Sequence, residues 1–209
     1  MNMIERGINI LVKPTTEWNN IKKEKWTIQN LFVKYAMILA AIPAVAGFIG
    51  QSVIGVSFFG ATFRQPPVNG IIFAVLSYIL ALGTTFLMAF IIDALAPTFG
   101  AVKNMEDSLK IVVFANTAAW VAGIFAILPA LGILAFGGSI YSLVLLYFGM
   151  KSLKNPPKDK MVGYYVVTLI IWIVIAVIAA VVVGAIALTS VGAGVATDAA
   201  EAFKMIPRS

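Results

Sequence analysis

The sequence predicts an all-α membrane protein: a bundle of about five transmembrane helices preceded by short interfacial amphipathic helices. Of its 209 residues, 61% are hydrophobic and 11% are charged, whereas soluble domains carry about 25% charged residues. The apolar residues form long blocks, and a helix of roughly 20 residues crosses a bilayer core of about 30 Å. A soluble helical protein is the alternative, but blocks of this length have no polar face to present to water.

Residues 1–30 are predicted to form two short amphipathic helices on the membrane surface. In the first, Ile4, Ile8 and Leu11 share one side of the helix. Pro14 separates it from the second, which carries tryptophan beside lysine, a combination that suits the lipid headgroup layer. The predicted membrane-surface residues are Trp18, Lys22, Lys25 and Trp26.

Five hydrophobic blocks follow, and they define one transmembrane domain over residues 31–191. Pro97 and Gly100 end the second block, and Pro129 begins a tight turn between the third and the fourth. The small and polar residues 192–209 are predicted to be a tail outside the cytoplasm. The predicted spans are 31–59, 71–96, 111–128, 131–150 and 162–191.

The lysine and arginine residues predict the orientation of the bundle. If the N-terminus lies in the cytoplasm, twelve of the 15 basic residues fall in cytoplasmic segments and three fall outside. This bias follows the positive-inside rule and favours five spans with the N-terminus inside and the C-terminus outside. The net charge of +6 then faces anionic lipids at the cytoplasmic surface, which predicts the lipid bilayer, and not nucleic acid, as its partner.

The search for catalytic or ligand-binding residues yields no complete set. The chain has neither histidine nor cysteine, which removes the Ser-His and Cys-His nucleophile pairs and the usual zinc ligands. No glycine-rich phosphate loop stands between a strand and a helix. We therefore predict a protein that is not an enzyme and that has no cofactor and no metal.

Two polar residues within the spans are candidates for a functional role, as are the helix-ending residues Pro97, Gly100 and Pro129. Asp93 is the only acidic residue inside a predicted span, and a charge in the bilayer is a functional candidate by default. It lies four residues before Pro97, so water or a lysine such as Lys103 offers a purely structural explanation. Asn116 is expected to link helices through its amide. A transport role for Asp93 and Asn116 is the alternative.

A small-residue face is predicted in the fourth span. Gly138 and Ser142 stand four residues apart, the spacing at which small side chains let two helices approach closely. Such a face can pack inside the bundle or against a second copy of the chain. The sequence leaves both possibilities open.

Several short motifs stand in a suggestive order. Residues 14–21 read Pro-x-x-x-Trp-x-x-Ile, residues 99–100 read Phe-Gly, residues 129–132 read Pro-x-x-Gly, and residues 147–151 read Tyr-x-Gly-Met-Lys. In order and spacing, over about residues 1–190, the chain resembles the Yip1-domain family of five-span membrane proteins, in its prokaryotic branch.

The resemblance implies an N-in, C-out bundle, in agreement with the lysine count. The eukaryotic relatives sit in early secretory membranes, bind Rab-type GTPases and one another, and are linked to vesicle trafficking and membrane shape. Their Asp-Leu-Tyr-Gly-Pro motif is absent here, so we do not carry over GTPase binding. We expect a non-enzymatic protein of a prokaryotic cytoplasmic membrane that scaffolds or organises membrane and partner proteins. A channel, transporter or lipid-moving protein is the alternative.

Overall fold

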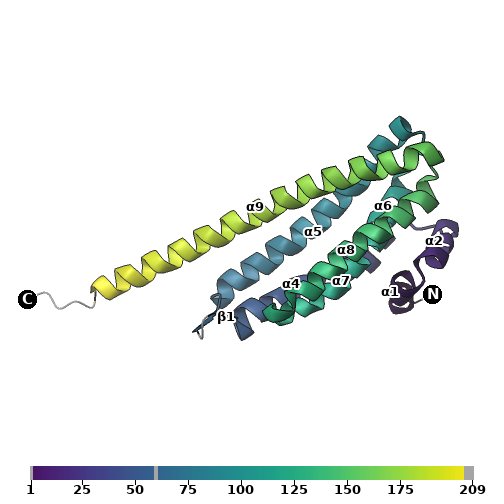
Figure 1. The fold of residues 1–209 in the computed structure, drawn as a ribbon. Helices are drawn as coiled ribbons and strands as arrows, with labels where there is room; N and C mark the ends of the chain where they lie inside the picture. The colour runs from purple at the N-terminus through teal and green to yellow at the C-terminus, as the bar shows by residue number, and fades with distance from the viewer. Residues whose placement is uncertain (1, 59–60, 205–209) are drawn as a thin grey trace, which may run out of the picture.

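The computed structural model describes residues 2–58 and 61–204, which form an all-α bundle (Figure 1). Within these residues, five helical segments are long and apolar enough to cross a membrane, which confirms the predicted fold class. They run roughly along one direction, with α1 and α2 at one end and strand β1 at the other (Figure 1). The five segments are Ile28–Ile54, Pro67–Phe99, Met105–Ile127, Gly132–Lys154 and Lys158–Ala185.

Two short helices, α1 (Met3–Val12) and α2 (Pro14–Lys23), precede the spans. Pro14 takes the first position of α2, where its missing N–H leaves no helical hydrogen bond unmade. Trp18 is only 1% exposed and belongs to the core, so neighbouring protein residues cover the ring that we predicted to lie among lipid headgroups. The amphipathic pattern of α2 does bury one face, but protein, and not lipid, covers it.

The other predicted membrane-surface residues stay nearer to the solvent. Lys22 and Lys25 are exposed, and Trp26 is half-buried with its ring edge-on to that of Phe114, 5.8 Å away. They belong to the end of the bundle that carries α1 and α2, which we call the basic end because exposed lysines collect there. These lysines are Lys22, Lys23, Lys25, Lys103, Lys151, Lys158 and Lys160.

The first span is assembled from four consecutive helical segments and ends earlier than predicted. It stops at Gly55, which has a φ of +89° that favours glycine. A short antiparallel hairpin follows, with Val56 opposite Phe63. Its residues are as apolar as the helix before it, so hydropathy extended the predicted span to residue 59. The four helical segments are α3 (Ile28–Leu31), η1 (Phe32–Ala36), α4 (Met37–Phe48) and η2 (Ile49–Ile54). The two strands of the hairpin are β1 (Val56–Phe58) and β2 (Ala61–Phe63).

The second and third spans meet through a tight turn at the basic end. Gly100 ends the second span with a φ of +66°, and the side chain of Asn104 caps the third by accepting from the N–H of Glu106 at 3.0 Å. The third span is the centre of the bundle, because every residue from Ser108 to Ala115 is buried. The segments are α5 (Pro67–Leu95), η3 (Ala96–Phe99), α6 (Met105–Ala115), α7 (Thr117–Ala122), η4 (Gly123–Ile127) and η5 (Pro129–Leu131).

The last two spans are α8 (Gly132–Gly149), extended by η6 (Met150–Lys154), and α9 (Lys158–Lys204). Helix α9 packs along α5 and extends well beyond the other helices (Figure 1). The predicted boundary at residue 192 is therefore not a helix end, because α9 continues to Lys204. The rest of the predicted tail, residues 205–209, lies outside the described residues.

Candidate functional site

A buried ion pair joins the second and fourth spans at the basic end. The ammonium of Lys154 lies 3.0 Å from Oδ1 of Asp93, and the Lys154 side chain is fully buried. Ser108 donates a second hydrogen bond to the same carboxylate oxygen, at 3.2 Å. The helix that carries Lys154 ends at once, because Asn155 adopts the left-handed conformation with a φ of +44°. This turn keeps the lysine at the level of the carboxylate.

The ammonium of Lys154 is saturated with acceptors. Besides Asp93, it donates to the backbone carbonyls of Asn104, at 2.9 Å, and of Val102, at 3.1 Å. The three protons of Lys154 thus cross-link the second span, the turn that follows it and the end of the fourth. The sequence suggested Lys103 as the partner of Asp93, but Lys103 is exposed and Lys154 makes the pair. The observed contacts are those of a structural pair.

A second charged network fixes the N-terminal helices to the spans. Arg6 is 3% exposed and forms an ion pair with Glu17 at 2.6 Å and a second one with Glu24. Its guanidinium also lies over the ring of Phe114, 5.8 Å from the centroid. We call Arg6, Glu17 and Glu24 the N-terminal network. The sequence does not reveal this network, because an arginine in a short surface helix is normally solvated.

Glu24 connects this network to the third span. Its carboxylate accepts from the indole N–H of Trp26 at 2.9 Å, and its backbone carbonyl accepts from Lys110 at 2.9 Å. Burial raises the pKa of Glu24, but the hydrogen bonds from Arg6 and Trp26 and the charge of Arg6 outweigh this effect. The pKa therefore lies below its ordinary value of 4.5. Glu24 is held as a carboxylate at neutral pH.

Trp18 and Gly149 bring two of the sequence motifs into contact. A Cβ placed on Gly149 would lie 2.8 Å from two carbon atoms of the Trp18 ring. Only glycine leaves room for this indole, which is also edge-on to Phe114 at 6.4 Å. The motif at residues 14–21 therefore docks α2 on the end of α8, within the motif at residues 147–151.

The residues that were predicted to end helices, Pro97, Gly100 and Pro129, lie in or beside turns. Pro97 accepts a backbone hydrogen bond from Gly100 at 3.0 Å, and a Cβ on Gly100 would contact Pro157 at 3.3 Å. The neighbouring Phe99 stacks on Tyr164 of α9, with the ring centroids 5.1 Å apart. Pro129 begins η5, in the predicted turn between the third and fourth spans.

The interior around Asn116 is tightly packed. Asn116 stands between α6 and α7 and donates to Thr85 of α5 at 3.3 Å, the kind of link between helices that we expected. The cavity beside it measures about 10 Å³, roughly the space of one water molecule. Asp93 is not among the residues that line this cavity.

Gly138 and Ser142 pack inside the bundle. A Cβ on Gly138 would lie 2.2 Å from the Cβ of Ala122. The backbone of α8 at Gly138 therefore packs directly against the Ala122 side chain of α7. Ser142 is buried, and its hydroxyl accepts from the N–H of Ala119 at 2.9 Å. Of the two possibilities that the sequence left open, the structure shows the contact within one chain.

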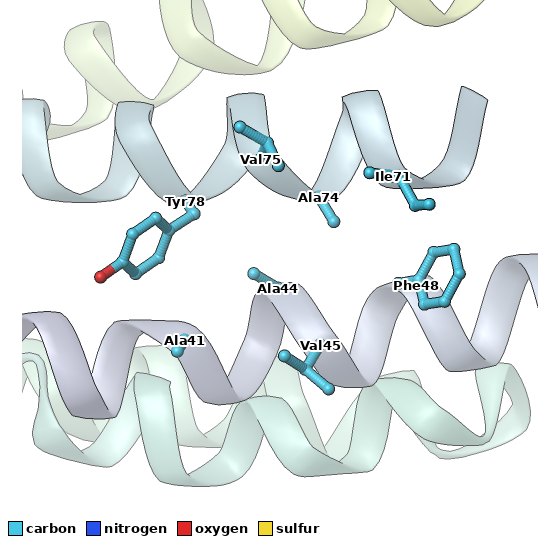
Figure 2. A pocket seen from close by; sticks show the side chains of 8 residues that line it. All are labelled: Ala41, Ala44, Val45, Phe48, Ile71, Ala74, Val75 and Tyr78. Atoms are coloured by element: carbon cyan, nitrogen blue, oxygen red, sulfur yellow. The ribbon is translucent and has the colours of Figure 1, made fainter. Parts of the chain in front are cut away.

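An apolar groove lies between α4 and α5, toward the end opposite the basic end (Figure 2). Its volume is about 310 Å³, and its one polar side chain is Tyr78, whose hydroxyl donates to the carbonyl of Met37 at 3.0 Å. A cavity of about 270 Å³ adjoins it and shares Ala44, Ala74 and Tyr78 with it. The groove is lined by Ala41, Ala44, Val45, Phe48, Ile71, Ala74, Val75 and Tyr78.

Comparisons with known proteins agree with this architecture. The family described as the Yip1 domain matches residues 8–182. The chain is similar to the inner membrane protein YohC of Escherichia coli strain K12 and to that of strain O6:H1, each 27% identical over 165 residues, which cover 77% of this chain and 85% of the relative. No solved structure is significantly similar. The chain is a multi-pass protein of the cytoplasmic membrane, and it belongs to the Yip1 domain family.

Proposed function

We propose that this protein is a non-enzymatic scaffold that organises the membrane and partner proteins at the basic end. The observation that carries the proposal is the docking of α1 and α2 on the spans. Arg6, Glu17 and Trp18 are all buried there. Arg6 and Trp18 contact Phe114 of the third span, and Glu17 forms an ion pair with Arg6. The N-terminal helices therefore present a fixed outer surface.

A fixed surface favours binding of a partner because little conformational entropy is lost when the complex forms. The outer side of α2 keeps Thr16, Asn20 and Lys23 exposed, and exposed lysines surround it. The buried charges of the basic end hold elements together, since Asp93 pairs with Lys154 and Arg6 with two glutamates. The charged groups that remain exposed at the basic end are mainly lysines, which the docked helix α2 and the ends of the spans hold in fixed positions.

Site-specific photo-crosslinking in native membranes tests this proposal. A photoreactive residue at Thr16 or Lys23 reports on the docked surface, and the same residue at Val75, an exposed apolar position of α5, is the matched control. We expect reproducible protein adducts, including any second copy of the chain, at the α2 positions and few at Val75. The absence of any reproducible adduct at both α2 positions would refute the scaffold role.

A channel, transporter or lipid-moving protein remains the second candidate, and the groove between α4 and α5 is the observation that favours it. The groove opens among lipid-exposed side chains and is lined almost wholly by carbon atoms (Figure 2), so an acyl chain fits its chemistry. The groove supports a path between α4 and α5, in addition to the predicted one around Asp93 and Asn116, where the cavity beside Asn116 measures about 10 Å³.

Liposome assays of ion flux and lipid scrambling test the second candidate. The variant Ala74→Leu narrows the groove, and Asp93→Asn removes the charge of the predicted interior path. If wild-type liposomes show activity, selective loss in Ala74→Leu supports the groove, and selective loss in Asp93→Asn supports the interior. No activity above that of empty liposomes rules out this second role.

A further inference from the structure

A pocket at the basic end lies between α2 and the end of the fourth span. Its volume is about 340 Å³, and both polar and apolar side chains line it. Helix α2 forms one wall, and the last turn of α8 with η6 and Asn155 forms the other. The lining residues are Thr15, Trp18, Asn19, Lys22, Phe148, Lys151, Ser152 and Asn155.

The charge of the pocket is positive on both walls. Lys22 stands on the α2 wall and Lys151 on the facing wall, and no carboxylate is among the lining residues. Lys22 donates one hydrogen bond to the carbonyl of Ser152, at 2.8 Å, which leaves two of its three ammonium protons for another acceptor. The amides of Asn19 and Asn155 add further donors. Such a set of donors suits an anion with several oxygen atoms.

Two buried donors in the same walls lack a partner among the described residues. They are the indole Nε1 of Trp18, a residue that is 1% exposed, and the hydroxyl Oγ of Ser152. Most buried polar groups in proteins are hydrogen-bonded, so an unpaired N–H or O–H calls for an explanation. Both belong to residues that line this one pocket, so a ligand with hydrogen-bond acceptors in the pocket would lie beside both residues.

We propose that this pocket binds the phosphate of an anionic phospholipid from the leaflet at the basic end. The phosphate oxygens accept from Lys22 and Lys151, and the aromatic rings of Trp18 and Phe148 contact the glycerol and the first carbons of the acyl chains. The pocket adjoins the last turn of a membrane span, the depth at which headgroups lie. This site is independent of the scaffold role, because a bound lipid needs no protein partner.

Native mass spectrometry of the full-length protein tests the proposal with defined lipids. Phosphatidylglycerol is titrated against the detergent-solubilised protein, and zwitterionic phosphatidylcholine serves as the second probe. The pocket variant is K22Q/K151Q, and the matched control is K23Q/K25Q, which removes two exposed lysines of the same region that do not line the pocket. The single variant K151Q leaves the bond from Lys22 to Ser152 intact, so it separates binding from folding.

We expect one molecule of phosphatidylglycerol to bind more tightly than any further phosphatidylglycerol and more tightly than phosphatidylcholine. Each lysine near an anionic surface is worth a factor of about five, so K151Q should weaken this binding about fivefold and the double variant tenfold or more. Equal binding by wild type and K151Q overturns the proposal, as does equal weakening in K22Q/K151Q and K23Q/K25Q. Displacement of the lipid by millimolar inorganic phosphate, but not by chloride at the same ionic strength, would instead assign the pocket to free phosphate and overturn the lipid source.

Discussion

Replacing Lys154 with methionine should destabilise the bundle more than any other single change at the basic end. The Lys154 side chain is fully buried, and its ammonium bonds to Asp93 and to two backbone carbonyls. The methionine fills a similar volume but removes the cation from the Asp93 carboxylate and one hydrogen-bond donor from each of the two carbonyls. Breaking a buried ion pair by removing one partner costs about 3–5 kcal/mol.

This loss is large enough to measure by thermal unfolding in mild detergent. For a chain of this size, each kcal/mol lowers the melting temperature by about 2–4 °C, so Lys154→Met should melt about 6–20 °C below wild type. Asp93→Asn should cost less, because the amide oxygen can still accept from Lys154. The double variant removes the unpaired carboxylate and should regain part of the loss.

The control is Lys158→Met, which removes a lysine that is exposed at the same end of the bundle. It should melt within about 1 °C of wild type, as surface substitutions usually do. If Lys154→Met also melted within about 2 °C of wild type, the pair would not hold the spans together. Additive losses from Lys154→Met and Asp93→Asn would refute their coupling.

Three further predictions follow from the basic end and the orientation. Gly149→Ala should cost about 1–3 kcal/mol by thermal unfolding, because its Cβ would overlap the Trp18 ring, and a stability equal to that of wild type would contradict the contact. The depressed pKa of Glu24 means that its stabilising effect is complete above pH 4.5 and is lost as the pH falls through the lowered pKa. The protection factors for hydrogen exchange in α1 and α2 should therefore fall selectively in acid; a uniform fall across the chain would count against this. In this cysteine-free chain, a cysteine placed at Asn19 should be protected from an impermeant thiol reagent in intact cells and one at Arg64 labelled, whereas the reverse pattern would invert the orientation.

The parts of the fold that depend on local chemistry were predictable from sequence. Long apolar blocks located all five spans, and Gly100 ends its helix with the positive φ that glycine favours. The ends of the first and last spans were not predictable from sequence. Hydropathy does not distinguish an apolar hairpin from the end of the first span, or a longer helix from the last span that it continues. The hairpin with Val56 opposite Phe63 is an example.

The covering of α2 could not be predicted, and the reason is physical. An amphipathic pattern reports that one face avoids water, but lipid tails and a protein interior are equally apolar. Only the packed structure shows that Trp18 lies against Gly149, more than 100 residues later. The same limit hid Lys154, since a lysine in a basic loop is normally solvated, and nothing in its local sequence marks it as the partner of Asp93.

Three of the four motifs that carry the family resemblance mark packing contacts at the basic end and not reactive groups. Trp18 of the first lies on Gly149 of the last, and Phe99 of the second stacks on Tyr164. Each contact fixes an element at the basic end, so what the motifs specify is the shape of that end. Polar groups inside a membrane often mark an ion or substrate pathway, whereas the buried charges at the basic end are bonded to one another and to neighbouring backbone groups. Because the lysines outside these contacts remain exposed, we infer that binding at the basic end depends on them and on the rigid support beneath them.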